Sequence, residues 1–188
     1  MVIHYFGEGA FRLQSGEVSL LVDPTSTRLK ADGTLRTLIP ASVTGSAANE
    51  ILFPGEYEFN GIEVMGFTVP AESTEKFLKT VYLVRQEDIQ VALLGHLSKI
   101  PHAELMEKLG EPDVVILPMD GTHFLTVEDA VKLVKQLSPK LVIPSFSKHP
   151  AQIQKAFGGR AESAEKLVFR KKDLTGTQPR IVVLTHAS

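Results

Sequence analysis

Residues 113–144 limit the folds open to this chain more than any other segment. DVVIL (113–117) is a continuous apolar run, which is typical of a strand covered on both faces. TVEDAVKLVKQL (126–137) places apolar side chains at helical spacing after Thr126, a residue suited to cap a helix. LVIP (141–144) follows as a second strand. A strand, a helix and a strand in this order form a parallel, right-handed unit. The segment therefore predicts an α/β fold.

The first half of the chain consists instead of short β-type runs separated by turns. Asn60 and Gly61 lie between two such runs and tolerate the positive φ angles of a type I′ turn, which predicts a hairpin over residues 57–64. A second hairpin is expected from residues 81–84 and 89–94. The other predicted strands are 2–6, 11–14, 18–22, 38–39, 166–169 and 181–185, and the other predicted helices are 101–109 and 149–157. This order favours two sheets with helices outside them.

The composition narrows the class of protein. The 188 residues suit one domain with its own core, and no repeat or linker divides them, so a single domain over residues 1–188 is expected. There is no cysteine, which excludes disulfides, thiolate nucleophiles and cysteine-ligated zinc or iron–sulfur sites.

Charge and hydropathy argue against nucleic acid and membrane as partners. The net charge is −2, and the largest basic cluster, Arg170–Lys172, is followed by Asp173. A nucleic-acid surface needs a broader basic face than this. The first residues do not form a signal peptide, and no apolar run reaches the roughly 20 residues that span a bilayer. We expect a cytoplasmic protein.

Ligands of α/β proteins collect in the loops at the carboxyl ends of strands. The loop after the predicted strand at 38–39 is unusual, because LIPASVTGSAAN (38–49) contains no side chain that carries charge or binds a metal strongly.

Four strings resemble the metallo-β-lactamase-fold superfamily, and within it the ascorbate-phosphate lactonase-like or "Zn-dependent hydrolase" branch. YFGEGAFRLQSGEVSLLVDP (5–24) resembles the family opening, which ends in Asp-Pro. FPGEYEFNGIEV (53–64) resembles the Gly-Pro-Gly-Glu-Tyr hairpin, and LLGHL (93–97) resembles the Leu-Gly-Asp loop. The segment from Leu117 to Phe146 resembles the one that ends in Ile-Pro-Met-His. The resemblance covers nearly the whole chain and implies a shortened, four-layer αββα sandwich.

The resemblance also implies a metal site that activates water for hydrolysis. Matched residue by residue, the His-x-His-x-Asp-His ligands of the family fall on Ala41, Val43, Gly45 and Ser46. A further metal histidine falls near Ala71, the bridging aspartate on His96, the last histidine on Phe146, and a histidine beside the metal ligands on Glu8. Zinc is the cofactor expected of the family, but these residues leave too few donors to hold it. The sequence therefore predicts no metal cofactor.

Polar residues at the same loops define a remnant cleft. Glu8, His96, Asp120 and His123 are its candidate lining residues, and a carboxylate beside a histidine can act in acid–base chemistry or orient a polar ligand. A separate metal site built from His96, His123 and one carboxylate is an alternative.

Two functions follow from this pattern. The first is a metal-free, non-hydrolytic protein that binds a small polar ligand or a protein partner, with a homo-oligomer compatible with the sequence. The second is a hydrolase of lactonase or phosphodiesterase type that uses His96 and His123 with an atypical metal or as acid and base. The sequence favours the non-hydrolytic function over the hydrolase, and it indicates no catalytic residue.

Overall fold

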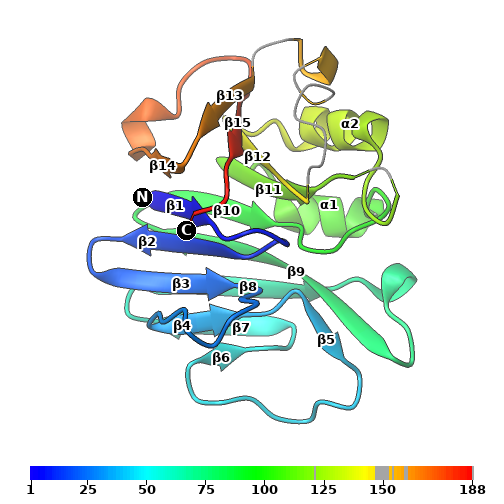
Figure 1. The fold of residues 1–188 in the computed structure, drawn as a ribbon. Helices are drawn as coiled ribbons and strands as arrows, with labels where there is room; N and C mark the ends of the chain where they lie inside the picture. The colour runs from blue at the N-terminus through cyan, green and yellow to red at the C-terminus, as the bar shows by residue number, and fades with distance from the viewer. Residues whose placement is uncertain (121, 147–152, 154, 159–160, 188) are drawn as a thin grey trace.

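The computed structural model describes residues 1–120, 122–146, 153, 155–158 and 161–187. Its strands form two sheets that lie face to face, with α-helices on the outer side of the larger sheet (Figure 1). This mixed α/β arrangement confirms the predicted sandwich.

The smaller sheet has six strands and is built mainly from the first half of the chain. In spatial order its strands are β14 (Lys166–Val168), β1 (Val2–Tyr5), β2 (Phe11–Ser15), β3 (Val18–Val22), β4 (Gly33–Leu35) and β6 (Glu50–Ile51). The first four pair antiparallel, whereas β3–β4 and β4–β6 are parallel.

The larger sheet has nine strands and combines both halves of the chain. In spatial order these are β13 (Ala161–Ala164), β15 (Arg180–Leu184), β12 (Leu141–Ser145), β11 (Val114–Pro118), β10 (Ile89–Leu93), β9 (Phe77–Gln86), β8 (Ile62–Thr68) and β7 (Gly55–Phe59), and β5 (Leu38–Pro40) pairs with β9 beside this order. Pairing is parallel from β13 to β10 and antiparallel from β10 to β7.

The predicted strand–helix–strand unit is present as β11, α2 (Val127–Leu137) and β12. The two strands pair in parallel, and Thr126 caps α2 by accepting the backbone N–H of Asp129 at 3.1 Å. Leu133 is buried on the apolar face of the helix, together with Ala130, Val134 and Leu137. The hairpin between β7 and β8 is also confirmed, with φ of 49° at Asn60 and 77° at Gly61.

Some boundaries differ from the prediction. The helix expected over 101–109 begins only at Ala103 (α1, Ala103–Leu109), because the His102 ring accepts the N–H of Leu105 and acts as the N-cap. Leu38 and Ile39 belong to β5, which among the described strands pairs with β9 alone, so the predicted strand is a short edge strand. The helix expected over 149–157 lies in part outside the described residues.

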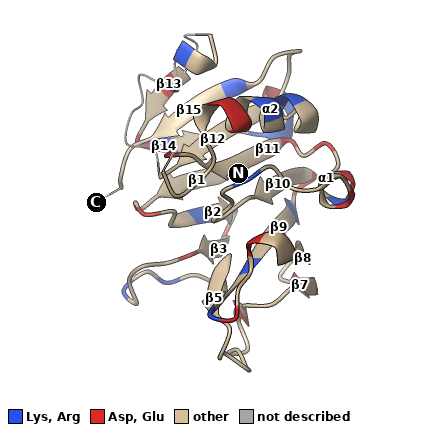
Figure 2. Cartoon of the chain, turned by 90° about the vertical axis from the view of Figure 1, so that its right-hand side faces the viewer, with Lys and Arg blue, Asp and Glu red and all other residues tan. Residues whose placement is uncertain are grey.

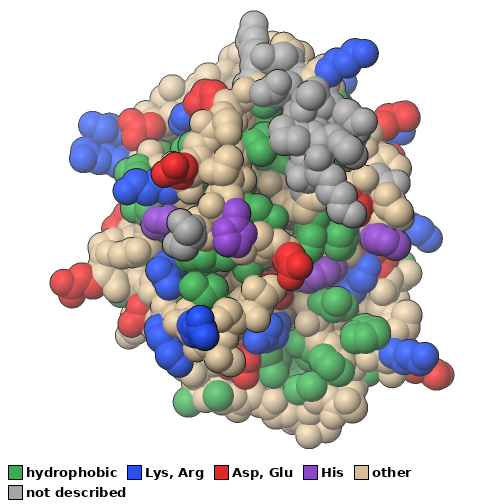
Figure 3. All heavy atoms as spheres, in the orientation of Figure 1, with side chains coloured by type: hydrophobic (Ala, Val, Ile, Leu, Met, Phe, Trp, Pro, Cys, Tyr) green, Lys and Arg blue, Asp and Glu red, His purple; other side chains and the backbone are tan. Residues whose placement is uncertain are grey.

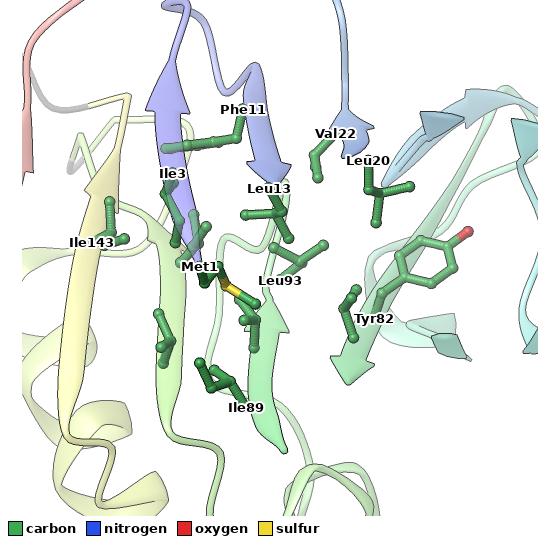
Figure 4. Packing of buried hydrophobic residues seen from close by; sticks show 14 of the residues in the cluster. Met1, Ile3, Phe11, Leu13, Leu20, Val22, Tyr82, Ile89, Leu93 and Ile143 are labelled. Atoms are coloured by element: carbon green, nitrogen blue, oxygen red, sulfur yellow. The ribbon is translucent and has the colours of Figure 1, made fainter. Parts of the chain in front are cut away.

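The main core fills the space between the two sheets. Leu13 and Leu20 project from the smaller sheet toward Leu93 and Tyr82 of the larger sheet, and Phe11 belongs to the same buried cluster (Figure 4). A second apolar cluster lies between the larger sheet and the helices α1 and α2. Because each fully buried side chain of this size contributes about 1.5–3 kcal/mol, burial in these two layers stabilises the fold.

Candidate functional site

A chain of three polar side chains joins the two sheets at the ends of their strands. Asp23 follows β3 in the smaller sheet, His96 follows β10 in the larger sheet, and Thr37 lies between β4 and β5. Thr37 Oγ1 lies 2.5 Å from Asp23 Oδ2 and 2.8 Å from His96 Nδ1. The backbone N–H of Thr37 also donates to Asp23 Oδ1 at 2.8 Å. One hydroxyl therefore links a carboxylate to an imidazole.

Burial sets the charges of Asp23 and His96 at neutral pH. Burial raises the pKa of Asp23 to about 6, and the two bonds from Thr37 oppose part of that rise. Burial also lowers the pKa of His96 to about 4, and the positive charge of Lys79 acts in the same direction. At neutral pH Asp23 is therefore ionised and His96 is neutral. Although Asp23 Oδ2 lies 3.8 Å from His96 Nδ1, the two do not form an ion pair there.

The backbone beside these residues is shaped to bring them together. Gly95 has a φ of 51°, and a Cβ at this position would lie 2.3 Å from both Cβ and Oγ1 of Thr37. Asp23 itself has a φ of 44°, in the left-handed region that aspartate tolerates better than most residues. The close approach of the His96 loop to Thr37 thus depends on the missing side chain of Gly95.

A second polar network holds the His96 loop from the other side. Lys79 Nζ donates to the carbonyl of His96 at 2.7 Å and to Glu72 Oε2 at 2.8 Å. Glu72 also accepts the N–H and the hydroxyl of Ser98 and the N–H of Lys99. Burial acts to raise the pKa of Glu72, but these bonds outweigh it and the pKa is lowered. The network fixes residues 96–99 against β9 and η1 (Pro70–Glu72).

Two phenyl rings cover one side of His96. The rings of Phe124 and Phe146 stack on each other with centroids 4.1 Å apart, and both lie within 6 Å of the His96 ring, at 5.8 Å and 5.4 Å. Phe146 has a φ of 57°, and its ring occupies the space that a Cβ on Gly9 would enter. A phenyl ring therefore stands where the resemblance places the last metal histidine.

The other lost-ligand positions bring no donor to the cleft. Ala41 and Val43 are half-buried, Gly45 and Ser46 are exposed in the loop after β5, and Ala71 is exposed in η1. Only Ser46 has a polar side chain, and a hydroxyl is a weak ligand for zinc. Among the residues that the structure describes, no group of three or more His, Asp or Glu side chains is arranged to hold a metal ion. These described residues do not fit the zinc site that the fold family implies.

The predicted cleft residues differ in their hydrogen bonds and in their exposure. Asp120 Oδ1 accepts the backbone N–H groups of Thr122, His123 and Phe124, so Asp120 braces its own loop and sets the position of the Phe124 ring. Slight burial acts to raise the pKa of Asp120, but these three bonds outweigh it and lower the pKa. Glu8 and His123 are exposed. Of the four candidates, His96 is the one that the recorded contacts tie to the polar chain.

The sequence interpretation missed Thr37 and the role of Lys79. Asp23 was noted only as part of the Asp-Pro string, and Thr37 lies in no motif. Its position beside His96 depends on how the two sheets meet, which short-range patterns do not encode.

The surface around these elements combines histidine, hydrophobic and charged side chains. Histidine side chains lie in a band across the middle of one face, with hydrophobic side chains gathered below and to the right (Figure 3). Lys, Arg, Asp and Glu are interspersed along the ribbon, as on α2, where Lys132 pairs with Glu128 and Asp129 (Figure 2). Within the described residues, no helix has the length and apolar character needed to cross a bilayer.

Comparison with known families decides the relationship. Residues 2–145 match the model of the family described as "Beta-lactamase superfamily domain". The chain belongs to the beta-lactamase superfamily. The predicted resemblance to the metallo-β-lactamase superfamily is thereby confirmed.

Individual relatives agree with this membership. The chain is 33% identical over 90 residues to a protein named "UPF0173 metal-dependent hydrolase" from Thermofilum pendens, a match that covers 48% of this chain and 39% of that relative. A solved structure from Thermotoga maritima, titled as a Zn-dependent hydrolase of the metallo-beta-lactamase superfamily, aligns with a TM-score of 0.79 at 22% identity over 97% of both chains. A metallo hydrolase from Ignicoccus hospitalis aligns with a TM-score of 0.69 at 17% identity, over 100% of this chain and 96% of its own. The two solved structures establish the metallo-beta-lactamase fold.

Proposed function

We propose that this superfamily member does not hydrolyse substrates through a metal and instead binds a small polar ligand in the remnant cleft around His96. The observation that carries the proposal is the contrast between lost and retained polar groups. The ligand positions hold Ala41, Val43, Gly45 and Phe146, whereas Asp23, Thr37 and His96 form a bonded chain at the same strand ends.

The chemistry of the remaining donors supports the metal-free interpretation. A catalytic zinc ion takes three protein ligands from nitrogen, oxygen or sulfur and keeps one open position. His96 Nδ1 is already bonded to Thr37 Oγ1, and the rings of Phe124 and Phe146 cover one side of the imidazole. A metal at this place would meet phenyl carbon where the family supplies nitrogen.

A second candidate function is a hydrolase, and the names of the relatives favour it. The Thermofilum pendens protein is named a metal-dependent hydrolase, and the Thermotoga maritima protein is titled a Zn-dependent hydrolase. A lactonase or phosphodiesterase activity of this chain would use an atypical site around His96 and His123. The neutral imidazole of His96 meets one requirement for a general base at pH 7.

Hydrolysis assays separate the two candidates. Protein purified without chelators or nickel resin is assayed against phosphodiester, lactone and β-lactam substrates, alone and with added Zn²⁺ or Mn²⁺. We expect no turnover above that of His96→Ala. The matched control is His102→Asn, which changes an exposed histidine that caps α1 and supplies another good cap. Metal-dependent turnover that is lost in His96→Ala and kept in His102→Asn would replace the binding proposal with the hydrolase.

The remaining features of the function stay predictions. They are a single domain, a cytoplasmic location, and a homo-oligomer or protein partner in addition to the small ligand. Gel filtration with light scattering measures the oligomeric state directly.

A further inference from the structure

We propose that Asp23, Thr37 and His96 form a directional hydrogen-bond relay that leaves His96 Nε2 unprotonated as the atom that receives a ligand. The ligand class is then a small, uncharged molecule that donates an O–H or N–H group. This inference rests on the proposed binding function and names the atom and the chemistry of that same cleft.

The direction of the relay follows from counting protons. An ionised carboxylate only accepts hydrogen bonds, so the single hydroxyl proton of Thr37 is donated to Asp23 Oδ2. Thr37 Oγ1 can then serve the His96 ring only as an acceptor, 2.8 Å away. Nδ1 must supply the proton of that bond. Because a neutral imidazole has one N–H, Nε2 is left with a free lone pair.

The surroundings keep the ring in this arrangement. Thr37 is almost fully buried, at 1% exposure, and its N–H holds the second oxygen of Asp23. Gly95 lets the His96 loop approach Thr37, and Lys79 fixes the carbonyl of His96. The His96 side chain keeps 18% of its surface exposed, and no hydrogen bond of Nε2 is found within the described part of the chain. The relay therefore presents a positioned acceptor at the cleft.

The protonation of Nε2 decides which ligands this acceptor suits. An unprotonated Nε2 offers only a lone pair, so a ligand must donate an N–H or O–H group to it. An anion such as a carboxylate can only accept hydrogen bonds and finds no donor at this atom. A donor with an apolar ring suits the same place, because the phenyl rings of Phe124 and Phe146 adjoin the imidazole.

Nitrogen NMR tests the relay without any ligand. A long-range ¹H–¹⁵N spectrum at pH 7.5 distinguishes protonated from unprotonated ring nitrogens, and His96→Gln assigns the His96 signals. We expect Nδ1 protonated and Nε2 unprotonated in the wild-type protein and in Thr37→Ser, which keeps the hydroxyl. Thr37→Val keeps the size but not the hydroxyl, and its spectrum should show the other tautomer or a mixture. A wild-type ring protonated at Nε2, or a Thr37→Val spectrum identical to wild type, would overturn the relay.

Two probes of similar size test the ligand class. Phenol donates an O–H, whereas benzoate at pH 7.5 is an anion that only accepts. We expect phenol to shift the Nε2 signal in a saturable way and benzoate to leave it unchanged, with phenol binding weakened a few-fold to about tenfold in Thr37→Val.

The outcomes separate the inference from the proposed function. An equal or larger shift with benzoate would overturn the ligand class, and the absence of a phenol shift would do the same. Metal-dependent turnover in the hydrolysis assays would overturn the proposed function instead, whatever tautomer the spectrum shows. If a Thr37→Val sample is unfolded, Thr37→Ala measured beside Thr37→Ser applies the same test with a smaller side chain.

Discussion

Two parts of the region that the family resemblance assigns to the metal site differ in polarity and burial. The corner around Asp23, Thr37 and His96 is polar, largely buried and internally bonded. The loop after β5, which the family fills with metal ligands, holds only small or uncharged residues from Ala41 to Asn49, and most of them are exposed.

The difference indicates which residues of this region the fold depends on. A buried carboxylate needs partners wherever it lies, so Asp23 and Thr37 support each other and must change together. An exposed loop residue has few contacts to lose, so metal ligands there can be replaced without harm to the sandwich. The predictions below test this contrast, from the largest expected effect to the smallest.

Gly95→Ala compared with Gly45→Ala gives the largest expected difference. A Cβ at Gly95 would overlap Thr37 and sit on a backbone with positive φ, whereas nothing lies within 4 Å of the same atom at Gly45. We expect Gly95→Ala to lower the free energy of unfolding by about 3 kcal/mol and Gly45→Ala to change it by less than about 0.5 kcal/mol. Urea unfolding measures both, and equal effects would remove the contrast between the two parts.

The pH dependence of stability should show that Asp23 and His96 oppose each other. The raised pKa of Asp23, about 6 against 3.8, means that its contribution is greatest at low pH and is lost as pH rises from about 4 to 6. The lowered pKa of His96, about 4 against 6.5, gives a contribution that is complete above about 6.5 and is lost as pH falls to 4. In the wild-type protein the two nearly cancel.

Single variants should uncover each slope. Relative to wild type, Asp23→Asn should lose stability as pH falls from 6.5 to 4, and His96→Gln should gain stability as pH falls from 6 to 4. Each relative change is on the order of 1–3 kcal/mol. Chemical unfolding at several pH values measures it. Parallel pH profiles for wild type and both variants would contradict the two shifted pKa values.

Phe146→Ala tests whether the phenyl ring at a lost-ligand position has become structural. Its ring stacks on Phe124 and covers Gly9, so its removal should lower the free energy of unfolding by about 1–2 kcal/mol. Phe77→Ala is the matched control, because the Phe77 side chain is 47% exposed on β9 and should cost less than about 0.5 kcal/mol. Thermal unfolding of the two variants in one buffer makes the comparison, and a larger loss for Phe77→Ala would go against it.

Ser46→Ala is expected to have the smallest effect. Ser46 is exposed in the loop after β5, at a position where the family holds a metal ligand. We expect the free energy of unfolding to change by less than about 0.5 kcal/mol and phenol binding to stay unchanged. A clear loss of binding would mean that this loop still contributes to the site.

The sequence predicted those elements whose signals are local. Asn60 and Gly61 indicate a hairpin because the turn requires positive φ. The N-cap and the apolar stripe of residues 126–137 likewise indicate the helix α2. The strand β13 was missed because its sequence AESA has no apolar alternation, and it is recognisable only once β15 pairs with it. The family strings indicated the position of the candidate site. Neither the local signals nor these strings predicted Thr37 as the hydrogen-bond partner of His96.

Thr37 illustrates why the candidate site could not be predicted in full from the sequence. Thr37 lies 59 positions before His96 in the chain, and the two meet because β9 brings β5 to the end of β10. Threonine is common and carries no charge, so no pattern distinguishes this one. The lost-ligand positions, by contrast, are predicted from sequence alone, because the family strings on either side set their register.

The metal content of untagged protein, purified without chelator or nickel resin and analysed by mass spectrometry of the elements, tests the central claim most directly. The residues at the lost-ligand positions predict far less than one zinc, manganese or iron ion per chain after gel filtration. One or two such ions per chain, retained through gel filtration and reduced in His96→Ala, would contradict the metal-free account.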